Sequence, residues 1–136
     1  MQAIIAGSHI PVSEAQIVNR EFEEVVRADR VRQMPRRLLL QVLHSTRALD
    51  SGLSSLIRAA GAVPNNSLGR MLQQLESSGI HGNRLPPGTA RYFQRRVVNV
   101  RNRYMHEAGA FPVAPLEISA LLSNMDACLT QSFRLW

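Results

Sequence analysis

The sequence predicts an all-α protein, a four- to five-helix antiparallel bundle, and three observations lead to this prediction. Apolar residues recur every three or four positions in five segments, as they do along the buried side of a helix. No segment shows the strict alternation of a half-buried strand. Glycine and proline divide the segments by short connections, which favour antiparallel neighbours.

The first two predicted helices meet at a proline. The first begins at Ser13, where Ser13 and Gln16 can form a capping box. It ends before Pro35, a residue that suits the first turn of the following helix. This second helix runs to about Ala60, and Gly52 in its middle can mark a kink.

Three further helices follow, separated by loops that are rich in glycine and proline. The third runs from Asn66 to Gly79. The fourth begins with Thr89 as its cap and ends at Gly109, and the fifth reaches Trp136. Each helix has one apolar side, so the helices must pack against one another.

A chain of 136 residues corresponds to one domain that can bury a core without disulfides. Residues 1–12 precede the first helix and can form a flexible N-terminal segment. The single cysteine, Cys128, excludes an intrachain disulfide and is expected in the core. Neither a signal peptide nor an apolar run of about 18 residues is recognisable. We therefore expect a cytoplasmic protein without a membrane partner.

The charge of the chain favours an anionic partner. The sequence contains 16 arginines and no lysine against 10 acidic residues, which gives a net charge of +6. Such a surplus favours nucleic acid or a protein with an acidic surface, and arginine suits bidentate phosphate contacts. A GC-rich coding bias explains the absence of lysine equally well, so charge alone does not decide the function.

The segment from Arg101 to His106 suggests a chemistry. Arginine can hold a phosphate, and histidine can move a proton near neutral pH. At about 100° per residue, Asn102 and His106 share one side of the fourth helix with Arg91 and Arg95, and Arg101 lies at the edge of the core. This arrangement predicts a basic polar surface, for which ordinary solvent exposure is the simplest explanation. The core-facing side carries Phe93, Val97, Val100 and Tyr104.

Arg101-Asn102 followed by His106 resembles the Arg-x4-His signature of the HEPN superfamily. The context is similar too, because the motif lies late in a long helix, a glycine turn follows it, and one more helix completes the bundle. The resemblance covers the whole chain in architecture but only residues 101–109 in motif. It implies a metal-independent endoribonuclease that acts as a homodimer and serves as a toxin or phage-defence effector, with an antitoxin or inhibitor protein as a further partner.

The resemblance also implies roles for individual residues. Arg101 would bind the scissile phosphate of an RNA substrate, and His106 would act as general acid or base. Asn102 would orient His106 or contact the phosphate. In the branch of the family that is paired with nucleotidyltransferase antitoxins, a tyrosine follows the histidine by two residues, but here Ala108 stands there. Control through such a tyrosine is therefore not expected.

Two other functions fit the same residues. One is a non-catalytic HEPN-like module that binds RNA, a nucleotide or a protein, and the other is a structural adaptor in which the motif is a coincidence. For RNA binding, the candidate contacts are Arg91, Arg95 and Arg103.

The other histidines suggest no chemistry of their own. None of the four histidines has the spacing of a metal site, so we expect neither metal nor cofactor. His44 lies among apolar residues and is expected to be a packing residue, and His9 and His81 are expected in solvent.

Overall fold

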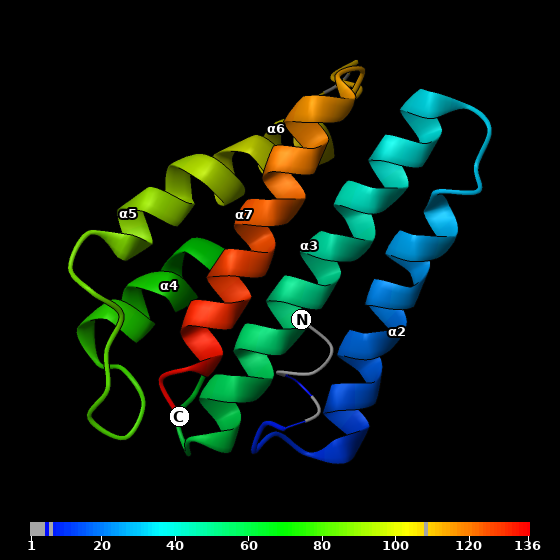
Figure 1. The fold of residues 1–136 in the computed structure, drawn as a ribbon. Helices are drawn as coiled ribbons and strands as arrows, with labels where there is room; N and C mark the ends of the chain where they lie inside the picture. The colour runs from blue at the N-terminus through cyan, green and yellow to red at the C-terminus, as the bar shows by residue number, and fades with distance from the viewer. Residues whose placement is uncertain (1–4, 6, 108) are drawn as a thin grey trace.

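The computed structural model describes residues 5, 7–107 and 109–136, and in these ranges the chain is an all-α bundle without a strand. The prediction of an all-α helical bundle is therefore confirmed. The elements are α2 (Val12–Ala28), α3 (Met34–Ala59), α4 (Leu68–Ser77), α5 (Thr89–Phe93), the π-helix η1 (Gln94–Val98), α6 (Asn99–His106) and α7 (Pro115–Phe133). Figure 1 shows α2, α3 and α7 side by side, with α4 and the α5–η1–α6 run on the side of α7 that faces away from α2. No helix in the described ranges has the length and apolar character needed to cross a membrane.

Most helix ends lie within a few residues of the predicted ones, but α2 ends at Ala28, well before Pro35, and two predicted N-terminal caps are wrong. α2 begins one residue before Ser13, and no side chain caps it. Gly88 precedes α5 with φ of 88°, so Thr89 lies inside the helix. The N–H groups of Gly88 and Ala90 donate instead to the carboxylate of Glu76 on α4, at 3.1 and 2.6 Å. These hydrogen bonds, above all the one from Ala90, lower the pKa of Glu76.

One apolar core connects all the helices, and it explains the positions of Gly52 and Cys128. A Cβ atom at Gly52 would lie 2.8 Å from Leu129 Cδ1, so this glycine lets α7 approach α3 closely while α3 continues through it. Cys128 is buried as predicted, and burial raises the pKa of its thiol to about 12. Of the N-terminal segment, residues 1–4 and 6 lie outside the described residues, whereas Ile5 and Ile10 are buried in the core.

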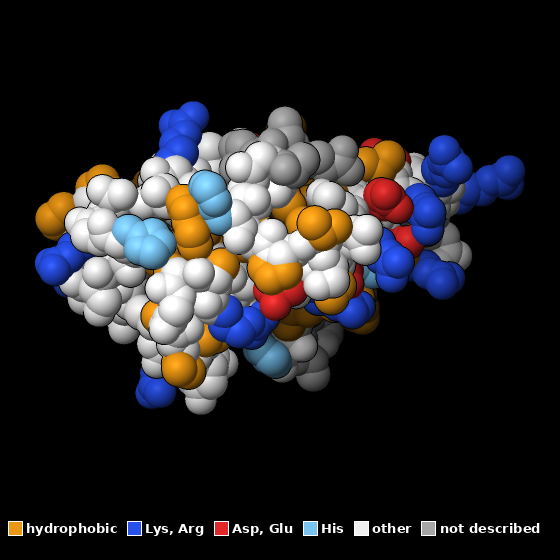
Figure 2. All heavy atoms as spheres, turned by 90° about the horizontal axis from the view of Figure 1, so that it is seen from below, with side chains coloured by type: hydrophobic (Ala, Val, Ile, Leu, Met, Phe, Trp, Pro, Cys, Tyr) orange, Lys and Arg blue, Asp and Glu red, His pale blue; other side chains and the backbone are white. Residues whose placement is uncertain are grey.

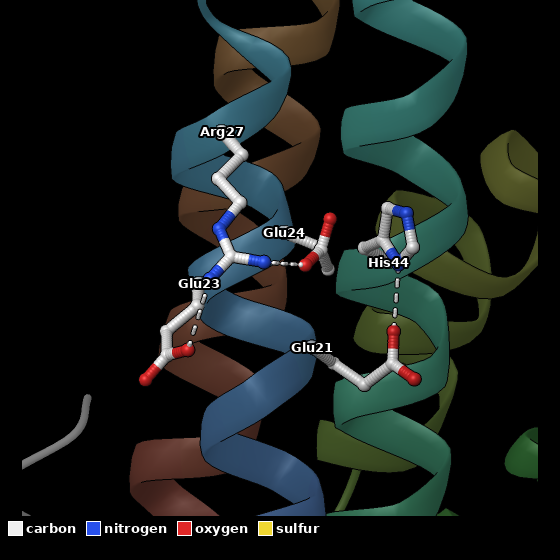
Figure 3. Close-up of polar contacts among 5 residues, drawn as sticks. All are labelled: Glu21, Glu23, Glu24, Arg27 and His44. Carbon is white, nitrogen blue, oxygen red and sulfur yellow. Dashed lines mark hydrogen bonds and ion pairs between the residues drawn. The ribbon is translucent and has the colours of Figure 1, made fainter.

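A polar pair joins α2 to α3 (Figure 3). His44 Nδ1 lies 2.7 Å from Glu21 Oε2, and the two side chains are only 17% and 12% exposed. Arg47 reaches the other oxygen of the same carboxylate at 3.1 Å. His44 is therefore a packing histidine, as the sequence predicts, and its Nδ1 has a hydrogen-bond partner on the neighbouring helix α2.

The two histidines in loops are exposed, as predicted, and both also contact the C-terminal tryptophan. The His9 ring stacks on Trp136 with a centroid distance of 4.7 Å, and His81 meets the same indole edge-on at 4.7 Å. Figure 2 views the molecule from this end and shows histidine and hydrophobic side chains next to one another. These contacts attach the N-terminal segment and the α4–α5 loop to the last residue of the chain.

Candidate functional site

The helical run predicted for residues 89–108 contains a π-helical turn at Gln94–Val98. η1 separates α5 from α6, and a π-turn rotates the residues that follow it relative to a continuous α-helix. Phe93 and Val97 are buried as predicted. Beyond them Val98 is buried instead, and Val100 and Tyr104 are only half-buried. Val100 and Tyr104 still pack against the core, so the predicted core side is confirmed, and Val98 is added to it.

Arg101, Asn102 and His106 line one groove between α6 and the N-terminal part of α4. The groove has a volume of about 560 Å³ and is open to solvent. Arg70 of α4 faces the three motif residues across it. The remaining lining residues include Ser67, Gly69 and Gln73 from the α4 side, and Gln94 and Val98 from η1. The structure thus brings the three predicted site residues together and adds a second arginine.

The Arg101 side chain lies at the boundary between this groove and the core. It is half-buried, and its Nε is buried without a hydrogen-bond partner among the described residues. The nearby carboxyl of Asp50 on α3 has its pKa raised by burial, and the positive charge of Arg101 opposes part of this rise. Arg101 lines the open groove, and a guanidinium in such a place is suited to bind an anion.

His106 and Asn102 lie one helical turn apart at the end of α6. His106 is exposed and Asn102 is half-buried. Over the described ranges, neither side chain forms an ion pair or a side-chain hydrogen bond, so both can turn toward a ligand in the groove. Ala108, which stands where one branch of the HEPN family has a tyrosine, lies outside the described residues.

The predicted RNA-binding arginines do not line the groove. Arg91 and Arg95 line a separate hollow on α5 and η1. Arg103 donates to the Tyr104 hydroxyl at 3.0 Å and to the carboxylate of Glu117 on α7. Arg91 and Arg95, predicted on the same side as Asn102 and His106, therefore line a different hollow from these two residues.

Two groove residues that the sequence did not single out depend on packing between distant helices. A Cβ atom at Gly69 would overlap Oε1 of Gln94. The absence of a side chain at Gly69 therefore lets the Gln94 side chain of η1 lie against α4. Gln94 Nε2 in turn donates to Asn99 Oδ1 at 2.9 Å. A glycine inside a short helix is a recognisable signal of close packing, but the sequence alone does not identify the partner.

We expect Asp50→Asn to raise the thermal midpoint at neutral pH. The folded-state pKa of Asp50 lies above the unfolded one, so the charged carboxylate disfavours folding once the pH exceeds the folded-state pKa. This cost fades as the pH falls toward the ordinary carboxyl pKa of 3.8, where both states bind the proton. Thermal melts of both proteins across this pH range measure the effect. A lower midpoint for Asp50→Asn at pH 7 would show instead that attraction to Arg101 outweighs desolvation.

The comparison with known proteins adds no family to this description. No model of a protein family matches the chain, and no characterised protein or solved structure matches it either.

Proposed function

We propose that the groove between α4 and α6 is the active site of a metal-independent endoribonuclease. The observation that carries this proposal is that Arg101, Asn102 and His106 line one groove together with Arg70. The groove therefore combines two guanidinium groups, an amide and an imidazole. These groups can bind the phosphate and accept one proton in a transesterification.

In this proposal Arg101 binds the scissile phosphate. Its half-buried guanidinium, with Asp50 nearby, is held at the edge of the core and loses little freedom when it binds an anion. The charge that develops on the phosphate oxygens in the transition state would be stabilised by Arg101, with Arg70 approaching from the opposite wall. Asn102 would donate from its amide to the phosphate or orient His106.

His106 would transfer the protons. The ribose 2′-oxygen attacks phosphorus while its proton passes to a neutral imidazole, and the bond from phosphorus to the 5′-oxygen breaks. The leaving 5′-oxygen takes up a proton, which leaves a 2′,3′-cyclic phosphate and a 5′-hydroxyl. One imidazole cannot accept the first proton and donate the second in the same step. A second His106, from another copy of the chain, would supply the acid.

A homodimer is part of the proposal for this reason, and an exposed apolar segment after the motif supports it. Phe111, Val113 and Leu116 are 61%, 64% and 86% exposed, and they follow His106 closely in the chain. Clustered exposed apolar side chains of this kind mark protein contacts.

We expect the protein to be dimeric at micromolar concentration, and we expect the double variant Phe111→Ser, Leu116→Ser to dissociate. Light scattering distinguishes the dimer from the 15.2 kDa monomer. Val63→Ser is the matched control, because Val63 is equally apolar and 85% exposed but lies in the α3–α4 loop. A wild-type protein that is monomeric at this concentration would contradict the shared site.

Cleavage of RNA in excess chelator tests the reaction itself. We expect the protein to cut a labelled RNA and to leave DNA of the same sequence intact, because DNA lacks the attacking 2′-hydroxyl. Cleavage of both polymers, or cleavage that requires an added divalent metal, would contradict the proposal. Binding of RNA without any cleavage would favour the non-catalytic module.

A further inference from the structure

A second hollow lies where α5 passes into η1, and it shares no lining residue with the groove. Its volume is about 320 Å³, and its lining consists of Gly88, Arg91, Tyr92, Arg95 and Arg96. The α-helix changes to a π-helix at Gln94, directly beside this hollow. π-helical turns are rare and frequently occur at functional sites.

The charge of the hollow is not balanced by the protein. Arg91, Arg95 and Arg96 are all exposed, and none of them forms an ion pair within the described ranges. The carboxylate of Glu76 interacts with Arg91 through space, but it accepts hydrogen bonds from the backbone N–H groups of Gly88 and Ala90. Positive charges gathered in this way repel one another, so a bound anion would stabilise them.

An aromatic ring is placed among these arginines. Tyr92 is 49% exposed, and the Phe93 ring meets its ring edge-on at a centroid distance of 5.2 Å. The guanidinium carbon of Arg96 lies over the Tyr92 ring, 5.6 Å from its centroid, so a base would stack on the opposite face. A half-exposed aromatic ring next to cations is the arrangement on which unpaired bases stack.

We propose that this hollow binds single-stranded nucleic acid, with a base stacked on Tyr92 and the flanking phosphates paired with Arg91, Arg95 and Arg96. A single strand fits better than a duplex, because the faces of its bases are free to stack on an aromatic side chain. An acidic protein would pair with the arginines but would leave the exposed ring unexplained. The inference does not depend on the proposed cleavage reaction, since neither Arg101 nor His106 lines the hollow.

The test is the affinity of the full chain for a fluorescent oligouridylate, measured by anisotropy in a His106→Ala background that prevents cleavage. Tyr92→Leu is expected to weaken binding about 10-fold, because it removes the stacking surface and keeps the apolar bulk. Tyr92→Phe is expected to bind like the parent. Arg95→Ala and Arg96→Ala should each lower the slope of log affinity against log salt by about one, whereas Arg32→Ala, an exposed arginine at the α2–α3 junction, should not.

Equal affinities of the parent, Tyr92→Leu and Tyr92→Phe would overturn the proposal. A second outcome would also overturn it. If polyglutamate displaces all of the bound RNA, and if the affinity of the protein for polyglutamate is the same with and without Tyr92→Leu, the hollow binds an acidic protein instead. Circular dichroism confirms that each variant is folded, and Tyr92 is exposed enough for its replacement to be tolerated. If the wild-type protein does not cleave RNA, this experiment still tests the hollow, because the anisotropy measures binding only.

Discussion

Replacing His106 with alanine is expected to slow RNA cleavage by at least about 100-fold, the lower limit of what a general acid or base contributes. Arg101→Ala is expected to lower the cleavage rate about 100- to 1000-fold, because it removes a group that stabilises the negative charge of the transition state. His106 is exposed, so its replacement should leave the thermal midpoint nearly unchanged. Single-turnover cleavage rates and thermal melts of the same preparations measure both effects.

Arg103→Ala is the matched control for these variants. Arg103 lies between the two site residues in the chain, but the Tyr104 hydroxyl and the Glu117 carboxylate hold it outside the groove. Its loss should therefore change the cleavage rate only a few-fold. Arg101→Lys keeps the charge but loses the planar fork, and it should recover only part of the rate. Equal rates for the wild type and His106→Ala would remove the catalytic role of the histidine.

Gly79→Ala is expected to lower the free energy of unfolding by about 2–5 kcal/mol. Gly79 ends α4 with φ of 69°, a left-handed conformation that costs another residue about 1–2 kcal/mol. A Cβ atom there would also overlap the backbone carbonyl oxygen of Asn83, and overpacking adds about 1–3 kcal/mol. The turn cannot move away freely, because the Asn83 side chain donates to the carbonyl of Leu135 at 2.8 Å.

Gly82→Ala separates the two contributions. Gly82 has a similar φ of 85°, but a Cβ atom added to it would meet no other atom within 4 Å, so only the backbone conformation adds a cost. Urea unfolding of both variants and the wild type measures the difference. Equal losses for Gly79→Ala and Gly82→Ala would show that the turn relaxes around the added methyl group.

The helices could be predicted from the sequence because their apolar sides repeat at helical spacing. The same pattern could not reveal the π-turn at residues 94–98, because Phe93 and Val97 fit an uninterrupted α-helix equally well. The cap of α5 was missed for a different reason. It comes from Glu76, a residue of another helix, so no local cap signal at Thr89 could identify it.

The residues of the candidate site also fall into those that the sequence could identify and those that only the structure brings together. Arg101, Asn102 and His106 are close in sequence, and one helix carries them into a single groove. Arg70 reaches the groove from α4, and Asp50 of α3 lies close enough to Arg101 for their charges to interact. Only the packing of separate helices places these two residues near the motif. The exposed ring of Tyr92 was likewise inconspicuous until the structure placed three arginines around it.

The chemical identity of the new RNA ends tests the central proposal most directly. The full chain is incubated with a labelled RNA in excess chelator, and the fragments are analysed by mass spectrometry. The proposal predicts 2′,3′-cyclic phosphate and 5′-hydroxyl ends from the wild type, and intact RNA from His106→Ala. Fragments with 5′-phosphate ends, or the same fragments from both proteins, would contradict a site in which His106 moves the proton of the 2′-hydroxyl.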